Sequence, residues 1–195
     1  VTLVDNGGED GQMKGTSVQT TTCMEKAIFA YNHSTSYVAD IIARANKYRS
    51  ADGAFSGSGE LGPMPKQPPR TVKQALAWAE GQTTNPSQNW YYACLAFVAR
   101  SYGLTSNVDW AIHEWDVTPT KYRHPGDKSI PAGALVFWDL GAGHPGHIAL
   151  SAGNGMVYSN DIRRKGKIDL VPADEITKKW GAKYVGWTPP YFPKA

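Results

Sequence analysis

Cys94 is the side chain whose type and position most strongly suggest chemistry in this chain of 195 residues. It follows the aromatic segment NWYYA and begins the segment CLAFVARSY, whose apolar residues recur at helical spacing. The sequence therefore predicts a cysteine in the first turn of a helix, where the backbone N–H groups and the helix dipole favour a thiolate. The alternative is a small buried thiol that packs beside Leu95 and Val98.

His147 is the candidate general base, because it opens the apolar segment HIALSA. Side chains alternate along a strand, so His147, Ala149 and Ser151 should point to one face of a sheet. A sheet packed across the helix of Cys94 would bring imidazole and thiol together, and the imidazole would then take the thiol proton. The thiolate would attack an amide carbonyl, with the N–H of Cys94 helping to bind the oxyanion.

Four further residues are candidates for contact with a substrate. Trp90, Tyr91 and Tyr92 either line a cleft beside the cysteine or pack in the core, and His144 lies in the Gly-rich turn GHPG at the rim. A zinc site built from His144 and the proposed catalytic pair would lack a fourth ligand and any C-x-x-C pair. We therefore expect no metal and no other cofactor.

The elements that must position these residues can be predicted from the sequence pattern. A capping box at Thr71 and Gln74 predicts a helix that ends at Gly81, and residues 173–180 predict a short helix. Five segments have strand character: residues 134–140, 147–152, 155–161, 167–171 and 183–187. Asn154-Gly155 is a signal for a two-residue hairpin. The expected class is α+β, with helices packed on an antiparallel sheet.

Residues 70–191 resemble the NlpC-type cell-wall cysteine peptidases, which are small papain-like enzymes. The motifs that carry the resemblance are TVKQALAWA, NWYYACLAFV, PAGALVFW and HIALSAGNG. They match the family's opening helix, its aromatic loop with the nucleophile at a helix start, its P-x-G-x-L-V-F-[FW] strand and its histidine strand. The resemblance implies that Cys94 is the nucleophile and His147 the base.

Three departures from the family pattern concern the site. The usual Asp-Cys-Ser-Gly is Ala93-Cys94-Leu95-Ala96 here, so substrate contacts made through that Asp or Ser do not carry over. The family's G-D-L-V reads GALV. The third polar residue, which orients the histidine, normally lies twelve positions after it. That position is Ser159, and we rank Asp161 first, Ser159 second and Asn160 third, because a carboxylate orients imidazole best.

The segment before residue 70 has a different character. Residues 1–51 comprise an irregular arm and a predicted helical hairpin, and residues 52–69 have the Gly- and Pro-rich composition of a linker. Residues 22–48, with the motif AYN, resemble the last helices of lytic murein transglycosylases. The resemblance implies a remnant without activity, and an upstream transglycosylase domain in a longer natural protein. The predicted catalytic domain is residues 70–195.

Composition narrows the classes of partner. Twenty Lys and Arg against seventeen Asp and Glu give a net charge of only +3, which does not favour nucleic acid. The apolar runs are far shorter than the ~20 residues of a membrane span. Cys23 and Cys94 form either one disulfide or two separate thiols. A monomer is expected.

The resemblance implies hydrolysis of amide bonds in peptidoglycan stem peptides, at the D-glutamyl to diaminopimelate bond, by a secreted, wall-associated D,L-endopeptidase. Three alternatives remain open. The first is an N-acetylmuramoyl-L-alanine amidase, the second a wall-binding module without turnover, and the third a secreted antibacterial effector with the same hydrolytic site.

Overall fold

The computed structural model describes residues 29–30, 60–62, 66–106 and 108–193. The chain divides into two compact units, Val1–Asp52 and Gly53–Ala195. In the first unit only residues 29 and 30 are described, and both are helical. The predicted hairpin, and Cys23 with it, otherwise lies outside the described residues.

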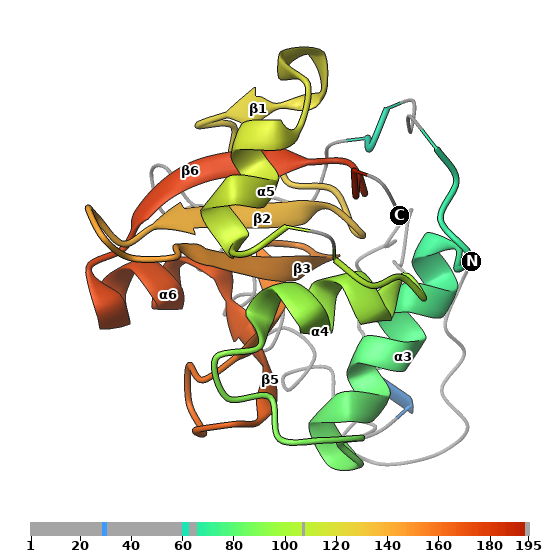
Figure 1. Cartoon of the computed structure of the whole chain (residues 1–195). Coiled ribbons are helices and arrows are strands. Elements are labelled where there is room, and N and C mark those ends of the chain that lie inside the picture. Colours follow the sequence, from blue (N-terminus) through green and yellow to red (C-terminus); the bar gives the residue numbers. More distant parts are fainter. Residues whose placement is uncertain (1–28, 31–59, 63–65, 107, 194–195) are drawn as a thin grey trace, which may run out of the picture. The chain divides into compact units, whose positions relative to one another are not determined.

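The described part of the second unit is a mixed α+β structure with four α-helices and an open six-stranded antiparallel sheet (Figure 1). The helices are α3 (Val72–Thr84), α4 (Cys94–Ser101), α5 (Ala111–Val117) and α6 (Ala173–Trp180), and a 3-10 turn spans Thr120–Tyr122. The strands are β1 (His124–Pro125), β2 (Leu135–Asp139), β3 (His147–Gly153), β4 (Met156–Asn160), β5 (Ile168–Pro172) and β6 (Lys183–Thr188).

The sheet has the strand order β1-β6-β2-β3-β4-β5, and every neighbouring pair is antiparallel. Strands β3 and β4 form a hairpin whose turn, Asn154-Gly155, has positive φ at both residues, 54° and 72°. This is the backbone that a two-residue type I′ turn requires, and Asn and Gly adopt it at the lowest cost. Leu150 lies opposite Tyr158, which fixes the register that later decides the partner of His147.

Each face of the sheet is covered by helices. One core cluster joins Ile148 and Leu150 of β3 to Phe97 and Val98 of α4, together with residues of α3 and α5. The other joins Ala149 of β3 and its neighbours in β2 and β4 to Ala173 and Ile176 of α6. Helices α4 and α5 therefore cover one face, in front of β2 and β3 in Figure 1, and α6 covers the other. The alternation expected for β3 is confirmed.

Most elements begin and end close to their predicted positions, with three exceptions. The Thr71 capping box is present, but α3 continues past Gly81 to Thr84, because Gly81 is exposed and a helix tolerates a single glycine at about 1 kcal/mol. Helix α5 was not expected, since AIHEWDV is too short to show a clear period. Strand β1 was not expected either, because its two residues are a strand only by pairing with β6.

Candidate active site

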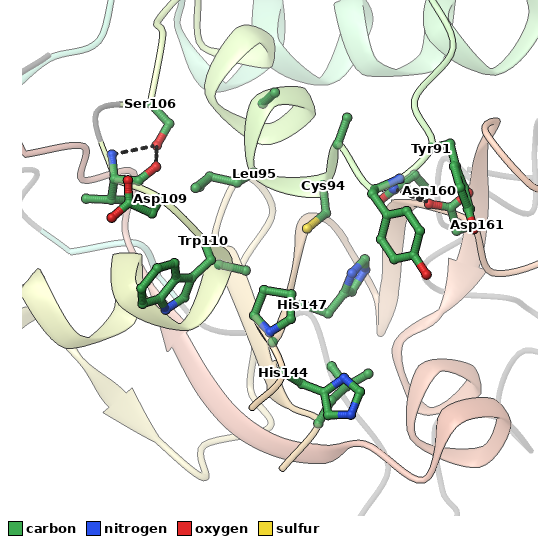
Figure 2. A pocket seen from close by; sticks show the side chains of 18 of the residues that line it. Tyr91, Cys94, Leu95, Ser106, Asp109, Trp110, His144, His147, Asn160 and Asp161 are labelled. Atoms are coloured by element: carbon green, nitrogen blue, oxygen red, sulfur yellow. Dashed lines mark hydrogen bonds between the residues drawn. The ribbon is translucent and has the colours of Figure 1, made fainter. Parts of the chain in front are cut away.

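A cavity of about 880 Å³ opens at the end of the sheet where β3 begins, and both Cys94 and His147 line it. Figure 2 shows the sulfur of Cys94 and the imidazole of His147 on neighbouring sides of this cavity. The two residues come from opposite faces of the sheet, since α4 covers the Ile148 face while His147 shares its face with Ala149. Both therefore line the cavity at the end of the sheet, whereas the sequence suggested an approach across its face.

Cys94 is the first residue of α4, as predicted, and remains partly exposed. Burial raises the pKa of its thiol, and the charge of Asp161 adds slightly to this effect. The backbone N–H groups of Ile148, Leu95 and Cys94 act in the opposite direction but do not outweigh burial. The sequence-based expectation of a thiolate at this helix start is therefore wrong for the resting site, in which the thiol is neutral.

His147 is held by aromatic rings and one hydroxyl. Its side chain is 4% exposed, its ring meets Trp180 of α6 edge-on at 5.0 Å between centroids, and Trp138 lies at 6.1 Å. Burial lowers the pKa of the imidazole to about 3. Its Nε2 lies 2.7 Å from Oγ of Ser159. The Ser159 hydroxyl donates to the carbonyl of Asn160 at 3.4 Å, so we assign the proton of the neutral ring to Nε2, which donates to Ser159, and leave Nδ1 without a proton.

The turn before His147 is fixed from both sides. The backbone N–H of Ile112 in α5 donates to the carbonyl of Pro145 at 3.0 Å. Gly146 has φ 70°, and a Cβ there would lie 3.0 Å from both Cβ of Ile112 and the carbonyl oxygen of Trp138. Only glycine suits this backbone and this close approach. The start of β3 is thus clamped between α5 and β2, which sets where His147 enters the cavity.

The structure corrects the predicted order of partners for His147. Ser159, ranked second, makes the hydrogen bond to the imidazole, and Asp161, ranked first, does not. With Leu150 opposite Tyr158, a continued register would set Asp161 opposite His147. However, β4 ends at Asn160 and Asp161 has φ 62°, so the chain turns away. Ser159 is the diagonal neighbour on the same face and reaches the ring.

Asp161 and Asn160 instead hold the loop that leads to Cys94. The carboxylate of Asp161 accepts hydrogen bonds from the N–H of Tyr92 at 3.0 Å and of Gly166 at 2.6 Å. The Asn160 amide donates to the carbonyl of Trp90 at 2.8 Å and to Asp161 at 2.7 Å. Both residues therefore position Cys94 through its loop, and neither replaces Ser159 as partner of the histidine.

Of the four residues predicted to contact a substrate, three line the cavity and one lies in the core. Trp90 is fully buried, packs against the rings of Trp78 and Phe97 and donates its indole N–H to Gln82, so it is a core residue and not part of the cleft wall. Tyr91, Tyr92 and His144 line the cavity. Trp90 faces inward because the loop reverses at Tyr92, whose φ is 54°.

Several cavity residues were not predicted from the sequence, among them Trp110, Trp180 and Lys165. Trp180 closes the short amphipathic helix α6, and nothing in its local pattern indicates that it contacts the histidine strand. Trp110 is 45% exposed, which the sequence around it did not indicate, since Ala111 and Ile112 follow it.

Within the described ranges, no three His, Cys, Asp or Glu side chains are placed to hold a metal ion. In the same part of the chain, no helix has the length and apolar character needed to cross a membrane.

The different positions of Ser159 and Asp161 give a testable contrast. For hydrolysis by Cys94 and His147, Ser159→Ala should lower kcat roughly tenfold without changing KM, because one neutral hydrogen bond that orients the imidazole is lost. Asp161→Ala should mainly raise KM and lower the unfolding midpoint, because it frees the loop beside the cavity.

Ser151→Ala removes another buried hydroxyl, on β3, and serves as the control. Steady-state kinetics with thermal unfolding measures both effects, and an unchanged kcat for Ser159→Ala would contradict the assignment.

Comparison of the chain with models of known protein families and with curated proteins finds no match in either case, so the chemistry of this cavity is the basis for inferring what the protein does.

Proposed function

We propose that this protein is a cysteine hydrolase that cleaves amide bonds in the stem peptides of peptidoglycan. The observation that carries the proposal is the arrangement of Cys94 and His147 in one cavity, with Ser159 on the far nitrogen of the imidazole. A nucleophile, a base and a group that orients the base are the three parts that acyl transfer through a covalent intermediate requires.

The ionisation of the two groups determines how the first step proceeds. An imidazole with a pKa of about 3 is a weak base, and the thiol pKa is raised, so a separated ion pair is unfavourable before substrate binds. Proton transfer from Sγ to Nδ1 therefore accompanies formation of the bond from Sγ to the carbonyl carbon. Ser159 accepts Nε2–H throughout, which leaves Nδ1 as the nitrogen that can take the thiol proton.

The start of α4 supplies the charge stabilisation for this step. The first N–H groups of a helix have no partner inside it, so the N–H of Cys94 is available to the developing oxyanion. The imidazolium then gives its proton to the departing amine as the C–N bond breaks. Water attacks the resulting thioester, with the neutral imidazole again as base, and the free thiol is restored.

The substrate class follows from the resemblance to NlpC-type peptidases, whose papain-like fold we propose for the second unit. It favours the D-glutamyl to diaminopimelate bond and a secreted, wall-associated endopeptidase. The open mouth of the cavity supports a branched substrate, because aromatic side chains, Tyr91 at 42%, Tyr92 at 80% and Trp110 at 45% exposure, stand around it.

Digestion of purified sacculi tests the proposal. The intact chain should release products whose new termini, read by mass spectrometry, are a D-glutamyl carboxylate and a diaminopimelyl amine. A free L-alanyl amine and an unsubstituted lactyl carboxylate would instead identify an amidase. Wall material that binds the protein but yields no new termini would refute hydrolysis.

A further inference from the structure

Three side chains on two loops beside the nucleophile form a polar cluster at the cavity mouth. Tyr91, Tyr92 and Lys165 all line the cavity, and we call them the Tyr–Lys cluster. The tyrosine rings lie 4.3 Å apart between centroids, and the ammonium of Lys165 is 4.1 Å from the centroid of the Tyr91 ring. Figure 2 shows Tyr91 directed toward the cavity, on the same side as Asp161. No step of the proposed mechanism uses these three residues.

The ammonium of Lys165 beside two tyrosines gives the cluster the character of an anion site. The pKa of the Tyr91 hydroxyl lies below its usual value, because that oxygen accepts hydrogen bonds from Tyr92 and Lys165. The pKa of Tyr92 lies above its usual value, because its hydroxyl donates to Tyr91. The Tyr91 O–H and the other N–H groups of the Lys165 ammonium remain as donors for a ligand. A cation and a hydroxyl donor at one point favour a carboxylate.

The cluster is also held in place before any ligand arrives. Tyr92 has φ 54°, an unfavourable backbone for an aromatic residue, and Asp161 maintains it by accepting its N–H. The negative charge of Asp161 would repel an anion, but it already accepts hydrogen bonds from Tyr92, Gly166 and Asn160. Those donors direct the carboxylate into the loop and leave Lys165 as the charge beside the two tyrosines, while Arg100 and Asp109 also line the cavity.

We propose that the Tyr–Lys cluster binds a free carboxylate of the substrate next to the scissile amide. The inference deepens the proposed function and rests on it. A γ-linked D-glutamyl residue carries its α-carboxylate a few bonds from the reacting carbonyl, and Tyr92 precedes Cys94 by only two residues in the chain. An alanyl residue in the same position carries no carboxylate. The cluster therefore selects a γ-glutamyl residue on the acyl side of the bond.

Two matched substrates test this selection with the full chain. One is the tripeptide L-Ala-γ-D-Glu-diaminopimelate with its free α-carboxylate, and the other has a carboxamide at that position. The wild type should cleave the carboxylate with a kcat/KM about tenfold higher, mainly through KM, as one partly exposed charge-assisted contact allows. Lys165→Met should remove the preference, with the larger loss of kcat/KM on the carboxylate tripeptide. Added salt should weaken the preference of the wild type.

Lys167→Met is the matched control, because Lys167 is an exposed lysine of the same loop and does not line the cavity. This variant should keep the tenfold preference, and Tyr92→Phe should reduce it. Equal cleavage of both tripeptides by the wild type would overturn the carboxylate site while the hydrolase proposal stood. A preference that persists in Lys165→Met would overturn the assignment to Lys165. Failure to cleave either tripeptide or sacculi would refute the proposed function itself.

Discussion

Replacing Cys94 with alanine is expected to abolish cleavage of stem peptides, with a loss of at least about 10⁴-fold in kcat, because the covalent route disappears with the sulfur. Serine at the same position should be nearly as inactive. A buried neutral imidazole with a pKa of about 3 is too weak a base to activate a hydroxyl.

The fold should tolerate both substitutions at Cys94. Cys94 as a residue is half-buried at the start of α4, and alanine and serine are close to cysteine in size, so the unfolding midpoint should change little. Product release from sacculi, measured beside thermal unfolding, separates loss of chemistry from loss of fold. Residual cleavage within tenfold of the wild type by a folded Cys94→Ala variant would exclude Cys94 as the nucleophile.

The second large expected effect is a loss of stability at low pH, which is caused by protonation of His147. Its pKa is about 3 in the folded chain and 6.5 for an ordinary histidine, so between these values the unfolded chain binds the proton and the folded chain does not. The free energy of unfolding should therefore fall as the pH falls from 6.5 toward 3. The loss reaches at most about 5 kcal/mol, at 1.36 kcal/mol for each pKa unit.

His147→Gln isolates this effect, since glutamine has similar reach and does not titrate. Denaturant unfolding at several pH values should show the wild type losing stability below pH 6.5 relative to this variant. The free energy of unfolding of the wild type must be compared with that of His147→Gln, because Glu114 changes stability with pH in the opposite direction. Burial raises its pKa to about 8 from 4.5, so its contribution is lost as the pH rises through that range. Parallel pH curves for wild type and His147→Gln would show that the imidazole is not desolvated.

The sequence by itself determined most of the elements and the two candidate catalytic residues, Cys94 and His147. Apolar periodicity located α4 and placed Cys94 at its first residue, and alternation assigned His147 and Ala149 to one face of β3. The hairpin turn could also be predicted, because Asn154-Gly155 favours its backbone without any tertiary contact. These features depend on residues close together in the chain, so local physics is sufficient.

Only the tertiary structure decided what those residues can do. Ser159 became the partner of His147 because β4 ends one residue before Asp161 and the chain turns there. Trp90 lies in the core because it donates a hydrogen bond to Gln82 of α3 and packs against Phe97 of α4. The thiol is neutral because burial outweighs the helix terminus, and the imidazole is neutral because Trp180 of α6 and Trp138 of β2 exclude water. Burial and the end of a strand both depend on contacts between distant segments, and no local pattern contains them.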